Sequence, residues 1–381
     1  MTFIPFDLEY TQSIWEQKVD INLTESGVHP IRLDELLGED GEKVAELLAT
    51  EINYPHVNGN PELRENIAAL YDGAGAENVL VTVGAAEANN IIMQTLMEPG
   101  DELLTQTPTY KQVWGIAANS GNAVKSFRLV SEEGWAVDTD ELKTGISDKT
   151  RIIALVNPNN PTGKIMTEDE MNAVVAAADK VGAWILADEV YRGAERLQEE
   201  ETPSFYGRYD KVLCLGSMSK AYALPGLRVG WIVGPPDTVE DIWRRHEYTT
   251  ITASMLSNLL ATHALSPAVR PRLIQRTRNY IRNGFPILEE WMNSQDGMFS
   301  YTPPQASAVS FIQYHLDINS TELMETLCRE AGVFLGAGDS FGMDHHLRVA
   351  FGQPRATLEE AFRRIERTLQ DLSTRESSVA V

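Results

Sequence analysis

The residues best suited to chemistry lie in the run Ser217-Met218-Ser219-Lys220, which is followed eight residues after the lysine by Arg228. A lysine amine reacts with aldehydes, and two hydroxyls with an arginine fork can hold a phosphate. Pyridoxal 5′-phosphate (PLP) carries both groups. The run therefore predicts that Lys220 holds PLP as a Schiff base, with Ser217, Ser219 and Arg228 around the phosphate. The alternative is a solvated turn with a surface lysine.

Short apolar runs alternate with helical stretches through the middle of the chain. The runs cover residues 79–83, 152–156, 184–187, 212–215 and 229–233. Helix signals lie between them, such as the capping box Thr167-Glu168-Asp169-Glu170. This alternation is typical of an α/β fold with a mainly parallel sheet covered by helices on both faces. Ligands of such sheets collect at the carboxyl ends of the strands.

The pattern changes after about residue 270, where a long helix, an αβ segment and a last helix follow. We expect an N-terminal segment at 1–45 that joins a smaller domain, a large cofactor-binding domain at 46–270, and the smaller α+β domain at 271–381. A chain of 381 residues is long enough for two packed lobes.

Further candidates follow predicted strands. The turn Gly84-Ala85-Ala86 could bind phosphate through backbone N–H groups, or could be only a tight turn. Asn160 stands in a loop rich in proline and asparagine, and its amide could donate to a phenolate or carboxylate oxygen; a surface turn is the alternative. Asp188 could keep a pyridine nitrogen protonated, or could cap a helix.

Two tyrosines and an arginine complete the set. Tyr191 could reach a ring oxygen, and Tyr110 could stack on the ring face or be a core tyrosine. Arg348 lies inside the apolar run His346-Leu347-Arg348-Val349. A buried arginine needs an anion, and an amino-acid carboxylate fits its fork, although an internal salt bridge would also satisfy it.

Together these motifs resemble the fold-type I PLP enzymes, the aspartate-aminotransferase-like class I/II aminotransferases, over about residues 22–369. The motifs are Tyr54-Pro55…Gly59…Glu62-Leu63-Arg64, Gly84 to Ala88, Pro108-Thr109-Tyr110, Asn157 to Gly163, Asp188 to Tyr191, Ser217 to Lys220 with Arg228, and Arg348. The resemblance implies a seven-stranded-type sheet, mainly parallel, with a smaller α+β domain. It also implies PLP as cofactor and a homodimer.

The resemblance implies roles around the cofactor. Lys220 would bind it and shuttle the proton, and Asp188 would pair with the pyridinium. Tyr191 and Asn160 would bond the phenolate oxygen, and Tyr110 would stack on the ring. The groups implied for the phosphate are Ala85, Ala86, Ser217, Ser219 and Arg228, joined by Tyr54 from the other subunit of the dimer.

The same resemblance implies which residues bind the substrate. Arg348 would bind the α-carboxylate, with Asn160 and the backbone around Gly27 beside it. No arginine can be assigned to a side-chain carboxylate of the substrate, which puts aspartate as a substrate in doubt.

The leading hypothesis is an aminotransferase that moves an amino group between an amino acid and a 2-oxo acid. The segment Thr24 to His29 is similar to the capreomycidine-synthase branch, in which the scaffold eliminates and cyclises an arginine derivative. A PLP lyase or cyclase is therefore the alternative. The segment His246 to Ile251 also departs from the aspartate enzymes. A PLP-sensing regulator built on this fold is disfavoured, because the fold is expected to begin almost at the N-terminus, which leaves no room for a DNA-binding module, and because the charge is strongly acidic.

The composition of the chain limits the kinds of molecule that it is expected to bind. The net charge of −23 argues against nucleic acids and anionic membranes as partners. No apolar run reaches the roughly 18 residues of a membrane span, and no signal peptide is visible, so we expect a cytoplasmic protein. Cys214 and Cys328 lie far apart and predict free thiols, and no cysteine or histidine spacing predicts a metal site.

Overall fold

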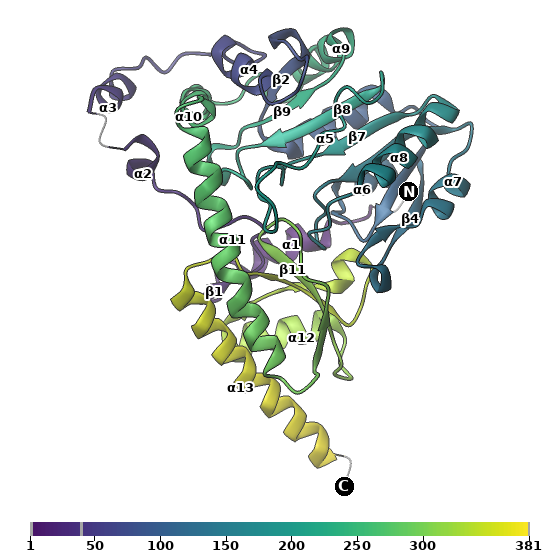
Figure 1. The fold of residues 1–381 in the computed structure, drawn as a ribbon, viewed down its shortest axis with the longest axis vertical. Helices are drawn as coiled ribbons and strands as arrows, with labels where there is room; N and C mark the ends of the chain where they lie inside the picture. The colour runs from purple at the N-terminus through teal and green to yellow at the C-terminus, as the bar shows by residue number, and fades with distance from the viewer. Residues whose placement is uncertain (1–2, 39–40, 380–381) are drawn as a thin grey trace.

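The computed structural model describes residues 3–38 and 41–379, and its centre is a sheet of eight strands in the order β2-β9-β8-β7-β6-β3-β4-β5 (Figure 1). The strands are β2 Val79–Thr82, β3 Glu102–Thr107, β4 Ala123–Val130, β5 Ala136–Val137, β6 Thr150–Val156, β7 Trp184–Asp188, β8 Val212–Ser217 and β9 Gly230–Val233. Only β9 and the short edge strand β5 run antiparallel to their neighbours. The expected mainly parallel sheet of seven strands is confirmed, with β5 added at one edge.

Both faces of this sheet are covered. In β6, Ile152 and Ala154 join one apolar cluster, whereas Ile153 and Leu155 join another on the opposite face. Strands buried on both sides need apolar residues at every position, which explains the continuous apolar runs of the sequence. The first cluster includes residues of the helices α5 (Gly84–Leu96), α6 (Gln112–Asn119) and α9 (Pro236–His246).

A second sheet forms the lower part of the molecule, and its strands follow the order β10-β11-β14-β13 with antiparallel pairing. These strands are β10 Phe299–Tyr301, β11 Val309–Tyr314, β13 Gly336–Ala337 and β14 His346–Ala350. The N-terminal strand β1 (Ile21–Asn22) pairs with β12 (Val333–Phe334), so the N-terminal segment joins this part. The domain limits at 45 and 270 stay predictions.

The remaining helices connect and cover the sheets. They are α1 Asp7–Trp15, α2 Leu33–Leu37, α3 Gly41–Leu48, α4 Pro61–Ala68, α7 Thr139–Gly145, α8 Glu168–Val181, α10 Met255–Leu265, α11 Arg270–Asn293, α12 Ser320–Thr326 and α13 Arg355–Val379. The predicted capping box opens α8, since the Thr167 hydroxyl accepts the Glu170 N–H and the Glu170 carboxylate accepts the Thr167 N–H. Within the described ranges no helix is long and apolar enough to cross a membrane.

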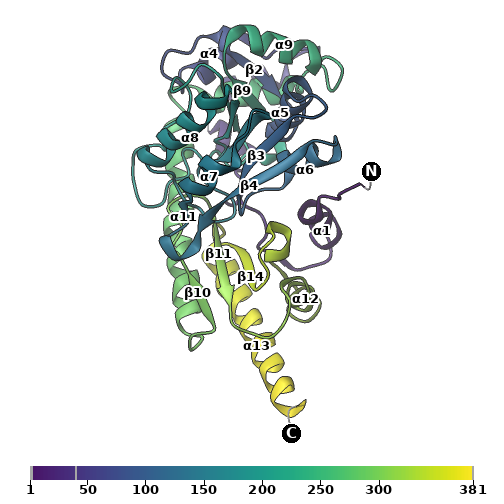
Figure 2. The same cartoon turned by 90° about the vertical axis from the view of Figure 1, so that its right-hand side faces the viewer.

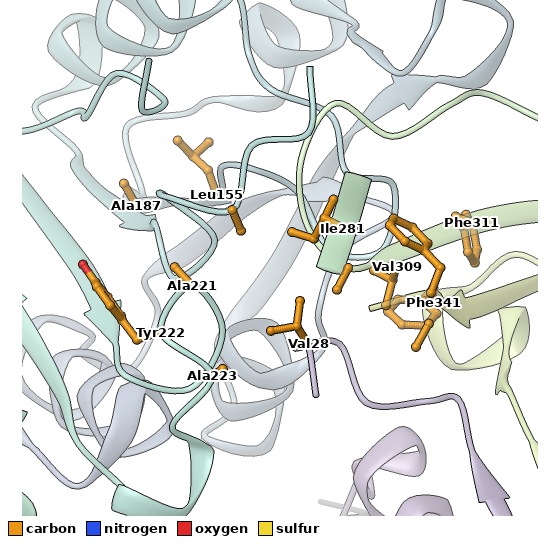
Figure 3. Packing of buried hydrophobic residues seen from close by; sticks show 14 of the residues in the cluster. Val28, Leu155, Ala187, Ala221, Tyr222, Ala223, Ile281, Val309, Phe311 and Phe341 are labelled. Atoms are coloured by element: carbon orange, nitrogen blue, oxygen red, sulfur yellow. The ribbon is translucent and has the colours of Figure 1, made fainter. Parts of the chain in front are cut away.

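One apolar core joins the upper and lower parts. Leu155 and Ala187 of the large sheet share a cluster with Ile281 of α11 and Val309 of β11 (Figure 3). Val28 lies among them and ties the N-terminal segment to this core. Figure 2 places α1 at the side of the molecule, between α6 above and α12 below. The N-terminal segment is thereby held beside the carboxyl ends of the parallel strands.

Candidate active site

A cavity of about 310 Å³ lies where the parallel strands of the large sheet end. Its lining contains nearly all the site residues predicted from sequence, namely Ala85, Ala86, Tyr110, Asn160, Asp188, Tyr191, Ser217, Ser219, Lys220, Arg228 and Arg348. Most belong to a strand or to the loop that follows one; Ala85 and Ala86 lie in the first turn of α5, which follows β2, and Arg228 precedes β9. The topology therefore brings together groups separated by up to about 260 residues of chain.

Lys220 follows the end of β8 and presents its amine to the cavity. Burial lowers the pKa of this amine; the Glu25 carboxylate opposes the shift and the Arg348 guanidinium adds to it. Gly27 lies directly behind it, because a Cβ at this position would stand 3.2 Å from the Ser219 carbonyl oxygen and 3.7 Å from Lys220 Cδ. The predicted proximity of Gly27 to the site is therefore observed, with the backbone packed against the lysine.

Asp188 and Tyr191 lie at the end of β7 and are both buried. Burial raises the pKa of Asp188 to about 6, although its carboxylate accepts the Val190 N–H at 3.2 Å. Burial also raises the pKa of Tyr191 to about 12. A buried carboxylate without a cationic partner is unfavourable, and a protonated heteroaromatic nitrogen would relieve this cost.

Arg348 on β14 is 2% exposed and lines the cavity. Its Nη1 donates to Asn160 Oδ1 at 3.0 Å, and its Nη2 donates to the Thr24 carbonyl oxygen at 2.7 Å. Its Nε has no hydrogen-bond partner among the described residues. Among the residues that the structure describes, Arg348 forms no salt bridge to a carboxylate, so the guanidinium has the unused donor capacity that an anionic ligand requires.

The opposite end of the cavity suits a phosphate. The turn before α5 places Ala85 and Ala86 at a helix start beside Ser219 and Arg228. Gly84 has a φ of +79°, and a Cβ there would lie 2.5 Å from an Arg228 Nη. Glycine is therefore required for the arginine to approach the helix start, where backbone N–H groups favour anions.

A hydrogen-bonded cluster holds this helix start against the segment after α9. The Glu87 carboxylate accepts the Val83 N–H at 2.6 Å and the hydroxyls of Thr249 and Thr250 at 2.7 and 2.6 Å. Its Oε2 lies 3.0 Å from Nε2 of the buried His246. Burial acts to raise the pKa of Glu87, but these bonds outweigh it and lower that pKa to about 2. The segment that begins at His246, which departs from the aspartate enzymes in sequence, therefore holds the start of α5 in place.

Glu87→Gln is expected to lower the free energy of unfolding near neutral pH by about 2 kcal/mol, because a neutral amide accepts these bonds less strongly. The folded-state pKa of about 2 lies below the ordinary 4.5, so the contribution is full above about pH 4.5 and is lost as the pH falls toward 2. Urea titrations should therefore show a smaller difference between the two proteins at about pH 3. Glu247→Gln, at an exposed neighbour, is the matched control. An equal difference at both pH values would contradict the role of the charge.

Sequence reasoning missed the cavity wall that the N-terminal segment supplies. Glu9 and Gln12 of α1, with Glu25 and Ser26 after β1, line the cavity. The Tyr110 hydroxyl donates to Glu9 Oε1 at 2.6 Å across 101 residues of sequence. The atypical composition of residues 24–29 marked this segment, but no sequence signal placed α1 beside the strand ends.

Asn89 and Gln112 were also missed, and they link α5 to α6. The Asn89 amide donates to Gln112 Oε1 at 3.0 Å, and the Gln112 amide donates to the Ala86 carbonyl oxygen at 2.9 Å. Asn89 also donates to the Asp188 carboxylate and acts to lower the pKa of that group. Tyr54, in contrast, is 82% exposed and does not line the cavity of its own chain.

The family model for aminotransferase class I and II matches residues 40–365. The chain belongs to this family. Capreomycidine synthase of Streptomyces vinaceus is 30% identical over 366 residues, which cover 93% of this chain and 90% of that protein. Arginine–pyruvate transaminase of Pseudomonas aeruginosa is 28% identical and covers 84% of this chain and 83% of its own.

Solved structures agree with this membership. A PLP-dependent aminotransferase from Streptococcus suis has a TM-score of 0.91 at 30% identity, covering 97% of this chain and 99% of that chain. The PLP-dependent cyclase OrfR has a TM-score of 0.86 at 25% identity, covering 97% and 98%. The aminotransferase-family enzyme described here therefore has fold type I and uses PLP.

The cavity fits this cofactor. It offers a buried carboxylate at Asp188 for a ring nitrogen, an amine of lowered pKa at Lys220 for an aldehyde, and Arg228 beside a helix start for a phosphate. Arg348, whose Nε has no partner among the described residues, is left for a second anion.

Proposed function

We propose that this enzyme transfers an amino group between an amino acid and a 2-oxo acid. The observation that carries the proposal is one cavity holding the Lys220 amine, the buried Asp188 carboxylate and the partly unpaired Arg348 guanidinium. The amine can react with an aldehyde, the carboxylate can stabilise a protonated ring nitrogen, and the guanidinium can bind the substrate carboxylate, which are the three tasks of the reaction.

PLP supplies, when bound, an aldehyde that captures amines and a ring that stores the electrons of the broken bond. Asp188 keeps the ring nitrogen protonated, and Tyr191 and Asn160 donate to the ring oxygen. Tyr110 covers the ring face. The phosphate is bound by Ala85, Ala86, Ser217, Ser219 and Arg228. These roles are the ones that the family resemblance implies, and their presence in one cavity lining supports them.

Arg348 binds the substrate α-carboxylate through its fork, and Asn160 and the backbone near Gly27 complete this site. Lys220 then takes the proton from the substrate α-carbon and returns it at a different atom. Its lowered pKa supports this task, because an amine must be neutral to act as a base.

A lyase or cyclase reaction is the second candidate, and the similarity to capreomycidine synthase and to a cyclase structure favours it. Such an enzyme would use Lys220 and Asp188 in the same way, but the proton taken from the substrate α-carbon would be delivered to a different atom. The reaction outcome is therefore set by residues near the substrate side chain rather than by the cofactor site.

A panel of amino acids with purified holoenzyme tests the proposal. Transamination predicts a change in the cofactor absorbance and one oxo acid formed per active site without an acceptor, and multiple turnovers when a 2-oxo acid is added. Continued release of ammonia together with an oxo acid, without an added acceptor and with the cofactor absorbance retained, would instead support a lyase.

We further propose a homodimer in which Tyr54 completes the phosphate site of the other subunit. The tyrosine is 82% exposed, and its neighbour Ile52 is 81% exposed, which suits a surface that a second chain covers. A mixture of Lys220→Ala and Tyr54→Phe chains should recover part of the wild-type activity, because each hybrid dimer rebuilds one intact site. Hybrids that form but stay as inactive as the parent variants would exclude shared sites.

A further inference from the structure

We propose that Glu9 and Glu25 select substrates whose side chain ends in a cationic group, a guanidinium or an ammonium. The inference deepens the proposed function and rests on it for the identity of the substrate site. It concerns the wall of the cavity that α1 and the segment after β1 provide.

The proposed binding of the cofactor and of the substrate α-carboxylate requires neither the Glu9 nor the Glu25 carboxylate. Lys220, Arg228 and Arg348 are the cations of the lining, and each faces a group of the cofactor or the α-carboxylate. Within the described residues the lining holds no further lysine or arginine, so a second carboxylate on the substrate would find no partner. Glu9 and Glu25 would instead repel it.

Both glutamates have free acceptor oxygens. Glu9 Oε1 accepts the Tyr110 hydroxyl at 2.6 Å, which orients the carboxylate and leaves Oε2 without a hydrogen bond among the described residues. Glu25 has no hydrogen bond and no ion pair within the described ranges. Its carboxylate nevertheless acts electrostatically on Lys220 and Arg348, so its negative charge influences the part of the cavity that contains these two groups.

Arg348 is a separate indication that a ligand binds in this cavity, and it determines how the bound amino acid is oriented. It is 2% exposed, lines the same cavity, and its Nε lacks a partner. With the α-carboxylate on Arg348 and the α-amine toward Lys220, the side chain extends along the remaining wall, where Glu9 and Glu25 lie. Both are exposed at the mouth, so a long side chain is needed to reach them.

Two unreactive ligands test the inference by calorimetry on the holoenzyme. 5-Guanidinopentanoate and 5-ureidopentanoate both carry a carboxylate for Arg348, lack an α-amine, and differ in the charge of the terminal group. We expect the guanidino ligand to bind at least about tenfold more tightly, the ratio given by one charge-assisted hydrogen bond. In the double variant Glu9→Gln with Glu25→Gln the ratio should fall toward one, with ureido binding unchanged.

Glu16→Gln removes the same charge from an exposed position just after α1, outside the cavity, and should keep the ratio. Glu25→Lys should add affinity for adipate, a dicarboxylate. Equal binding of the two ligands by the wild type, or an unchanged ratio in the double variant, would overturn the inference. Charge selection without any amino transfer would refute the proposed function alone, whereas transfer from neutral and cationic amino acids at equal efficiency would refute the inference alone.

Discussion

Replacing Lys220 by alanine is expected to lower kcat/KM for every amino-acid substrate by at least about 100- to 10,000-fold, the usual contribution of a positioned acid–base group. Lys220 is the lysine of the cavity lining, and burial lowers the pKa of its amine, which suits this amine to take and return the proton. Lys180→Ala, on the exposed end of α8, should be without effect.

Chemical mapping complements the kinetics. Borohydride treatment of the holoenzyme should fix the cofactor to the peptide that contains Lys220, and the alanine variant should yield no labelled peptide. A label on another lysine, or an alanine variant within tenfold of wild-type kcat/KM, would remove Lys220 from the mechanism.

Asp188→Asn is expected to lower kcat/KM by roughly 150- to 5,000-fold, since removing one partner of a buried ion pair costs about 3–5 kcal/mol. The amide has the same shape but cannot hold the ring nitrogen in its protonated form. Asp188 is 7% exposed, so water cannot replace the lost charge. The measurement is steady-state kinetics at saturating cofactor, with cofactor content checked by absorbance.

Asp179→Asn, at an exposed position of α8, is the control for the loss of one charge. A fully loaded Asp188→Asn enzyme with unchanged kcat/KM would show that the carboxylate does not act on the ring.

The large sheet and the cofactor end of the site could be predicted because their signals are local. The strands β6, β7 and β8 are largely continuous apolar runs, and each ends at, or is followed within a few residues by, a group such as Asp188 or Lys220. Strand topology then gathers these groups at one edge, which needs no knowledge of distant contacts.

The substrate wall could not be predicted for the opposite reason. Glu9 meets Tyr110 across 101 residues, and His246 meets Glu87 across 159, and neither pair has a periodic or local signal. Tyr54 is exposed in one chain, so the role proposed for it would depend on a second chain. The cytoplasmic location and the absence of nucleic-acid partners stay predictions from composition.

Nitrogen-15 tracing tests the central claim most directly. The holoenzyme is given an amino acid labelled at its α-amine, together with an unlabelled 2-oxo acid, and the label is followed by mass spectrometry. Amino transfer predicts that the label appears in the amino acid formed from the 2-oxo acid, at one atom per oxo acid released by the donor. Label recovered as ammonium, or retained in a cyclic product of the donor, would contradict it.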